Sequence, residues 1–182
     1  WGWTCTIRAG ANSAGSSLVN EKKMKGFSQH QILENFEIAS FNYNQQAKLQ
    51  NAVAWRLAKY CTRLNIPKGS WVDLGSGTGL LADALETCDP KQGVLRVDGS
   101  SGMLKRNKPG SSTQLWDLNL GLPPFSEGPS LLASSFCLQW LSNPSQRLEE
   151  WFSSLLPGGW IAIAIPVDGS FPQWHFAAQA AG

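Results

Sequence analysis

The spacing of apolar residues changes once along the chain, and the change separates two kinds of element. Between residues 28 and 64 apolar residues recur at steps of three and four, as at Ile32 and Phe36 and again at Val53 and Leu57. This period is typical of amphipathic helices, so two helices are predicted, with a break near 40–42. From residue 71 onward short continuous apolar runs replace that spacing, and such runs predict buried strands.

The apolar runs alternate with helical stretches over the rest of the chain. Strands are predicted at 71–74, 94–98, 114–117, 131–136 and 160–165. Helical patterns lie between them at 80–85, after the capping Ser100, and at 145–156. This alternation predicts an α/β fold, a doubly wound Rossmann-like parallel sheet.

The first 23 residues show neither period. They are rich in small polar residues, so residues 1–23 are expected to form a flexible N-terminal tail, with Met24 a candidate natural start. The helical region 24–66 and a cofactor-type domain over 67–182 complete the expected organisation.

Composition narrows the classes of partner. The 182 residues are 42% hydrophobic and 15% charged, which suits one globular domain. A net charge of +2 without a basic block predicts no nucleic-acid partner. Four scattered cysteines without a C-x-x-C spacing indicate neither a metal site nor a disulfide framework, and no apolar run is long enough for a membrane span. A cytoplasmic location is therefore expected.

The first predicted strand breaks into a run of alternating glycines. Gly75, Gly77 and Gly79 follow Trp71–Leu74 and precede a helical run, and glycine lets a backbone come very close to a ligand. The dinucleotide pattern G-x-G-x-x-G would need a glycine at position 80, where this chain has Leu80. A dehydrogenase is therefore disfavoured, while a simple strand-to-helix turn stays an alternative.

Acids end the next two predicted strands. Asp98 lies about twenty residues after the loop, where a carboxylate can accept both hydroxyls of a ribose. Asp117 ends the third strand and could accept from the exocyclic amine of an adenine, with Trp116 or Leu118 against the ring. A helix-capping Asp98 and a turn Asp117 are the alternative interpretations.

As a set, these motifs resemble a known family. VDLGSGTG, VDGSSGML, the acid of WDL, and LLPGGWIAIAIP, in this order over roughly residues 70–166, look like the motifs of class I S-adenosylmethionine-dependent methyltransferases. The resemblance implies S-adenosyl-L-methionine as the cofactor and helices 24–66 that cap its site. The cofactor-binding residues that it implies are Asp73, Gly75, Ser76, Gly77, Gly79, Asp98, Gly99, Met103, Trp116, Asp117, Leu118 and Ser135.

A narrower resemblance lies outside these motifs. SFNYNQQAKLQNAVAWRL, SSFCLQWLSNP and GSFPQWHFAAQAAG resemble segments of the biotin-synthesis malonyl-[acyl-carrier protein] O-methyltransferases. The LQW triplet is shared with trans-aconitate methyltransferases, so methylation of trans-aconitate or another small acid stays open. Ser76 stands where that family often has cysteine, a mild change.

The implied reaction esterifies the free carboxylate of malonyl-acyl-carrier protein. A carboxylate is already ionised at neutral pH, so in-line methyl transfer needs alignment rather than a general base, and no catalytic side chain is expected. Candidates for the acceptor side are Tyr43, Gln139 and Trp140, with Ser135 at the border. His30 and His175 are interpreted as surface or packing residues.

The resemblance also implies more strands than this chain can hold. The family's sheet has seven strands, the last two forming an antiparallel hairpin, whereas the sequence ends at Gly182, soon after the fifth predicted strand. We therefore expect a C-terminally truncated sheet with its fifth strand at an open edge, and a helical segment over 171–182. A non-catalytic cofactor-binding fragment is the resulting alternative function.

Overall fold

The computed structural model describes residues 3–9, 28–167 and 170. A six-stranded sheet in the order β1-β6-β5-β2-β3-β4 forms its centre. The strands are β1 (Trp3–Ala9), β2 (Trp71–Leu74), β3 (Val94–Asp98), β4 (Thr113–Leu115), β5 (Leu131–Ser135) and β6 (Trp160–Pro166). β2 to β6 run parallel to one another, and β1 runs antiparallel to β6.

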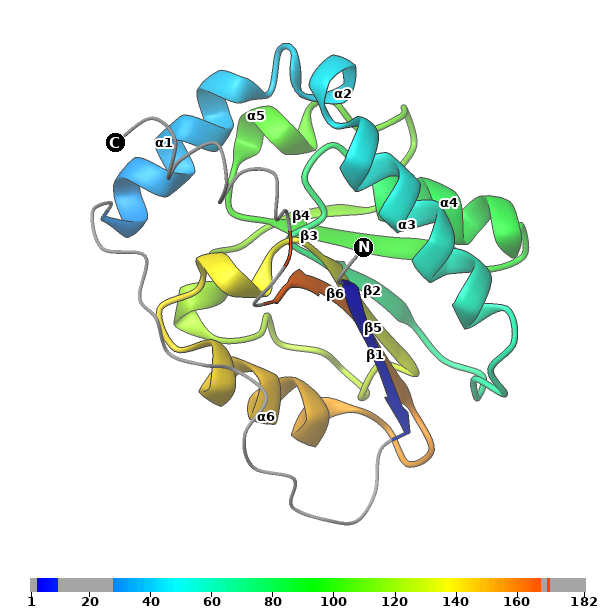
Figure 1. Ribbon diagram of the computed structural model, residues 1–182. Coiled ribbons are helices and arrows are strands. Elements are labelled where there is room, and N and C mark those ends of the chain that lie inside the picture. Colours follow the sequence, from blue (N-terminus) through cyan, green and yellow to red (C-terminus); the bar gives the residue numbers. More distant parts are fainter. Residues whose placement is uncertain (1–2, 10–27, 168–169, 171–182) are drawn as a thin grey trace.

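Helices cover both faces of this sheet and one of its ends (Figure 1). They are α1 (Gln29–Ala39), α2 (Tyr43–Gln46), α3 (Lys48–Cys61), α4 (Leu80–Cys88), α5 (Ser101–Leu104), η1 (Leu118–Leu120), η2 (Leu138–Trp140) and α6 (Pro144–Ser154). α3 and α4 lie on one face and α6 on the other, while α1, α2 and α5 gather beyond one end of the strands. The predicted doubly wound α/β fold is confirmed.

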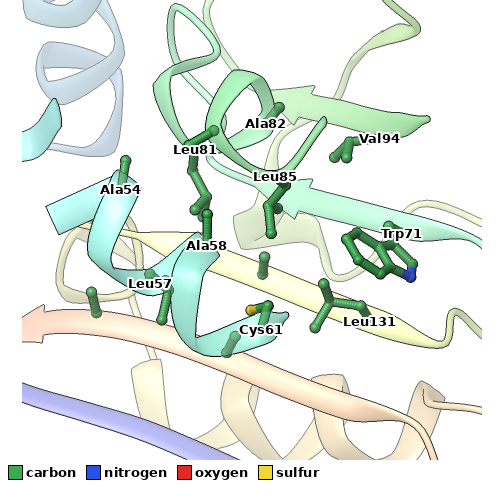
Figure 2. Close-up of a cluster of buried hydrophobic side chains, with 14 residues drawn as sticks. Ala54, Leu57, Ala58, Cys61, Trp71, Leu81, Ala82, Leu85, Val94 and Leu131 are labelled. Atoms are coloured by element: carbon green, nitrogen blue, oxygen red, sulfur yellow. The ribbon is translucent and has the colours of Figure 1, made fainter. Parts of the chain in front are cut away.

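Alternate strand residues divide the core between the two faces. Figure 2 shows the cluster under α3 and α4, where Leu57 and Ala58 of α3 lie near Leu81 and Leu85 of α4 above the buried Leu131. The second cluster surrounds Trp151, the fully buried tryptophan of α6. Since successive residues of a strand point to opposite faces, each of β2, β5 and β6 supplies side chains to both clusters.

The expected N-terminal tail is wrong for residues 3–9. These seven residues form β1, which pairs with β6 from Trp3 opposite Pro166 to Ala9 opposite Trp160. Residues of high strand propensity, Trp, Thr and Ile, recur in this segment, and pairing with β6 supplies the hydrogen-bond partners. The rest of the predicted tail, 1–2 and 10–23, lies outside the described residues.

The open edge expected at the fifth parallel strand is also wrong, because β1 covers β6 along its full length. The helix expected over 171–182 lies outside the described residues. Within the part of the chain that the structure describes, no helix is long and apolar enough to cross a membrane.

Candidate cofactor site

A pocket opens where β2, β3 and β5 reach their carboxyl ends. The space between its atoms is about 660 Å³, part of it open to solvent. We call it the central pocket. Its lining residues are Ile32, Leu33, Phe36, Tyr43, Gly75, Gly77, Asp98, Gly99, Met103, Asp117, Leu118, Asn119, Ser135, Phe136, Cys137, Trp140 and Leu141.

The glycine loop forms one wall of the central pocket. Its three glycines all have positive φ, +70° at Gly75, +54° at Gly77 and +89° at Gly79, a region that residues with a Cβ rarely adopt. A Cβ on Gly75 would clash with the side chain of Cys137, whereas a Cβ on Gly77 would meet nothing within 4 Å. Of the three glycines in this loop, Gly77 is therefore the one whose backbone borders open space.

Asp98 ends β3 beside this loop. Its Oδ2 accepts the backbone N–H of Gly77 at 2.8 Å, and its Oδ1 accepts that of Ser100 at 2.8 Å. Burial raises the pKa of Asp98, although these hydrogen bonds work in the opposite direction. Each carboxylate oxygen has two lone pairs, so Asp98 keeps acceptor capacity for the paired hydroxyls of a ribose.

Asp117, Leu118 and Met103 form the next part of the pocket. The Oδ1 atom of Asp117 accepts the backbone N–H of Asn119 at 2.9 Å and its side-chain amide at 3.0 Å, so Asp117 caps η1. Met103 and Leu118 are buried and line the same pocket. An acceptor between two apolar side chains can hold a flat aromatic ring with an exocyclic amine.

α1 closes the pocket from the other side. Ile32, Leu33 and Phe36 turn one helix face to the pocket, and the Phe36 ring meets the Trp140 ring edge to face at 5.7 Å between centroids. The pocket therefore has an apolar cover on this side.

Glu37 fixes α1 to the start of α5. It accepts from the Ser100 hydroxyl at 2.6 Å, from the Gly102 backbone N–H at 2.8 Å and from the Ser101 hydroxyl at 3.3 Å. The hydrogen bond from Ser100 is the main reason why the pKa of Glu37 is lowered. Glu37 is not among the predicted site residues, because its partners lie more than sixty residues away along the chain and no local pattern marks them.

The segment after β5 supplies the remaining wall. Phe136 has a φ of +57°, the one positive value among the described residues other than glycine, and its N–H donates to Ala164 O at 2.8 Å. The turn places Ser135 and Cys137 at the pocket. The Oγ atom of Ser135 is buried without a hydrogen-bond partner, and burial raises the pKa of the Cys137 thiol well above its usual range.

Ten of the fifteen predicted site residues line the central pocket. They are Tyr43, Gly75, Gly77, Asp98, Gly99, Met103, Asp117, Leu118, Ser135 and Trp140. The other five, Asp73, Ser76, Gly79, Trp116 and Gln139, are not among its lining residues. The pocket also uses Ile32, Leu33 and Phe36, which the helical pattern marked only as an apolar face.

Asp73 instead lies on the face of the sheet that α3 and α4 cover. It is 1% exposed, and its Oδ2 accepts the backbone N–H of Ala82 in α4 at 3.1 Å, while Oδ1 has no hydrogen-bond partner. Burial raises the pKa of Asp73 from 3.8 to about 7. This carboxyl therefore anchors α4 to β2.

The side chains of Trp116 and Gln139 do not line the pocket. The indole N–H of Trp116 donates to Gly121 O at 2.9 Å and its ring packs against the cluster around Trp151. The Oε1 atom of Gln139 is buried without a partner. Ser76 is also buried, and its N–H donates to Val97 O at 3.0 Å.

The arrangement fits a nucleoside-containing cofactor. Gly77 offers a bare backbone, Asp98 a carboxylate at the pocket, and Asp117 an acceptor beside apolar walls. Groups of three or more His, Cys, Asp or Glu suited to a metal are absent from the described residues.

Curated proteins with related sequences include methyltransferases. The chain is 32% identical over 162 residues to a malonyl-[acyl-carrier protein] O-methyltransferase of Dechloromonas aromatica, covering 89% of this chain and 60% of that protein. It is 33% identical over 114 residues to a trans-aconitate 2-methyltransferase of Methylobacterium nodulans, covering 61% of this chain and 43% of that protein. The chain spans about 26 to 60% of the length of such relatives.

Solved structures with the same fold agree. A possible histamine N-methyltransferase of Thermotoga maritima, described as SAM-dependent, aligns with a TM-score of 0.61 at 22% identity, over 81% of this chain and 68% of that chain. A complex described as DhpI-SAM-HEP aligns with a TM-score of 0.59 at 17% identity, over 80% of this chain and 69% of that chain. The family model described as a methyltransferase domain matches residues 72–163, from β2 into β6. The chain therefore belongs to the methyltransferase-domain family, within the class I S-adenosylmethionine-dependent methyltransferases.

Proposed function

We propose that this protein is an S-adenosylmethionine-dependent O-methyltransferase that esterifies the free carboxylate of malonyl-acyl-carrier protein, a step toward the pimelate part of biotin. The observation that carries the proposal is the extent of the match. Similarity to the malonyl-acyl-carrier-protein enzyme covers 89% of this chain, against 61% for the trans-aconitate enzyme. An alignment of 162 residues extends beyond residues 72–163, the part that the methyltransferase-domain model matches.

The cofactor supplies an electrophilic methyl group on a sulfonium. In the proposed complex Asp98 accepts from the two ribose hydroxyls, and Asp117 accepts from the adenine amine between Met103 and Leu118. The bare backbone at Gly77 lets the cofactor lie against the loop. The apolar face of α1 would limit the access of water to the bound cofactor.

The acceptor needs only correct placement. An ionised carboxylate is itself the nucleophile, so the protein contributes alignment and a dry pocket rather than a base. Tyr43 and Trp140, both at the pocket, are the proposed acceptor-side residues. Burial is the main cause of the raised pKa of Tyr43, so its phenol stays protonated and can donate to the attacking carboxylate.

Charge at the pocket supports the carrier-bound acid over trans-aconitate. Among the residues that line the pocket, two are aspartates and none is basic. A free tricarboxylate would bring three negative charges toward these acids and the carrier-bound acid only one, so the Coulomb repulsion is smaller for the carrier-bound acid. A single terminal carboxylate on an acyl chain fits better.

The test is methyl transfer from labelled S-adenosylmethionine. We expect label on malonyl-acyl-carrier protein, and none on acetyl-acyl-carrier protein, which has the same carrier but lacks the free carboxylate. If trans-aconitate is labelled faster than malonyl-acyl-carrier protein, trans-aconitate takes the place of the proposed substrate.

Calorimetric titration with S-adenosylhomocysteine tests the alternative that the chain is a non-catalytic cofactor-binding fragment. Binding with no labelling of either acid would support that alternative. Absence of binding would contradict the cofactor site itself.

A further inference from the structure

Arg96 is a charged side chain on the side of β3 that α4 covers. Its side chain is 0% exposed, yet its Nη2 atom lies 2.8 Å from Asp83 Oδ1 and 2.7 Å from Glu86 Oε2, both in α4. Lys108 contacts the same two acids at 3.3 and 2.5 Å and is half-exposed. A buried guanidinium needs such partners, because an unpaired charge in the interior is very costly.

Asn107 connects this ion-pair cluster to the glycine loop. Its Oδ1 atom accepts from Arg96 Nη1 at 2.9 Å, and its Nδ2 atom donates to the Gly77 carbonyl at 3.0 Å. The same Nδ2 lies 3.0 Å from Leu104 O and 3.3 Å from Met103 O. One amide therefore joins β3, the end of α5 and the loop.

The loop passes directly over this pair. A Cβ on Gly79 would clash with Asn107 Oδ1 and lie 2.6 Å from Arg96 Nη1, so the network occupies the space that a side chain would need. This gives Gly79, which does not line the pocket, a separate reason to be glycine.

Gly77 is held from two sides as a result. Asn107 binds its carbonyl, and its N–H donates to Asp98 Oδ2 at 2.8 Å. The orientation of the loop at Gly77 decides which lone pairs of Asp98 are used by the loop and which still face the pocket. Fixing it before the ligand arrives avoids an ordering cost on binding.

We propose that Arg96 and Asn107 are positioning residues for the cofactor, which act through the Gly77 backbone on Asp98. The proposal rests on the cofactor part of the proposed function, with Asp98 as the ribose acceptor, and is independent of the identity of the methyl acceptor. Neither residue lines the central pocket, so both act without touching the ligand.

Asn107→Asp is the sharpest variant, because aspartate keeps the shape and the acceptor toward Arg96 but loses the donor to the carbonyls of Gly77, Met103 and Leu104. We expect the dissociation constant for S-adenosylhomocysteine to rise about tenfold, the size of one lost hydrogen bond of about 1.4 kcal/mol. Asn107→Ala, which adds no charge, should weaken binding at least as much.

Lys108→Ala is the matched control. Lys108 contacts the same acids of α4 but has no hydrogen bond to the loop, so we expect its binding change to stay within about twofold. Thermal unfolding of each variant shows whether it is folded at the titration temperature. Equal weakening in Lys108→Ala and Asn107→Asp would overturn the proposal.

A double-mutant cycle gives a readout that a merely structural role would not move. If Asn107 acts through Asp98, then Asn107→Asp should weaken binding far less in an Asp98→Asn background than in the native chain. Equal losses in both backgrounds would contradict the proposed path. Unchanged binding in Asp98→Asn alone would refute the ribose assignment, whereas a loss there with none in Asn107→Asp and Asn107→Ala would refute only the positioning role.

Discussion

The carboxyl ends of β2 and β3 differ although the sequence marks them in the same way. Each strand carries an acid at or near its end, Asp73 in β2 and Asp98 in β3. The register places Asp73 opposite Arg96, and Leu74 opposite Val97, so Asp98 lies one step beyond the end of β2. Asp73 is consequently covered by α4, while Asp98 reaches the central pocket. Register, rather than the presence of an acid, separates a carboxyl that anchors a helix from one that lines the pocket.

Exchanging Asp98 for asparagine should give the largest effect on binding. The amide would offer one acceptor oxygen in place of a charged pair, and hydrogen bonds to charged groups contribute about 1.5–3 kcal/mol. We expect the dissociation constant for S-adenosylhomocysteine to rise on the order of 10- to 100-fold, measured by calorimetry. A change below about twofold would remove the distinction between the two strand ends.

Glu37→Gln should have an intermediate effect, because Glu37 holds the cover of the pocket rather than its floor. Glutamine keeps one acceptor for Ser100 or Gly102 and loses the charge. Affinity for S-adenosylhomocysteine should fall by about three- to fivefold, as expected for a weakened exposed interaction. Glu34→Gln, on the same helix but paired with His30, is the control and should bind normally.

Asp73→Asn should have the smallest effect on binding, within about twofold, since its carboxyl faces α4. Its effect should appear in stability instead. The raised pKa of Asp73 means that the folded chain binds more protons than the unfolded chain between pH 3.8 and about 7, so this group makes the free energy of unfolding fall as pH rises through that window.

Urea unfolding at about pH 5 and about pH 8 measures this contribution. We expect Asp73→Asn to reduce the loss of stability between the two pH values. The same pH dependence of stability is measured for Asp98→Asn, because burial also raises the pKa of Asp98. A pH dependence identical to that of the native chain would show that Asp73 does not titrate as the structure indicates.

The fold was predictable because its signals are local. Apolar runs located the five parallel strands to within a few residues, and glycine spacing located the loop. β1 was missed because its partner β6 lies at the other end of the chain, and a strand without a strong period is visible only through its pairing.

The site was predictable in part. Asp98, Gly77 and Asp117 follow from strand ends, whereas the orientation of Trp116 depends on how the chain turns after β4. Glu37, Arg96 and Asn107 act through contacts between distant segments, which no residue pattern in one sequence reveals.

The pairing of β1 with β6 has a consequence for folding during synthesis. β1 leaves the ribosome well before β6 has been made, so this outermost pair of the sheet closes late. Contacts between such distant segments slow folding, because a long loop must close before the pair forms. Until then, β6 presents backbone groups that another chain can pair with, so the time between synthesis of β6 and docking of β1 is the period of greatest exposure to misassembly.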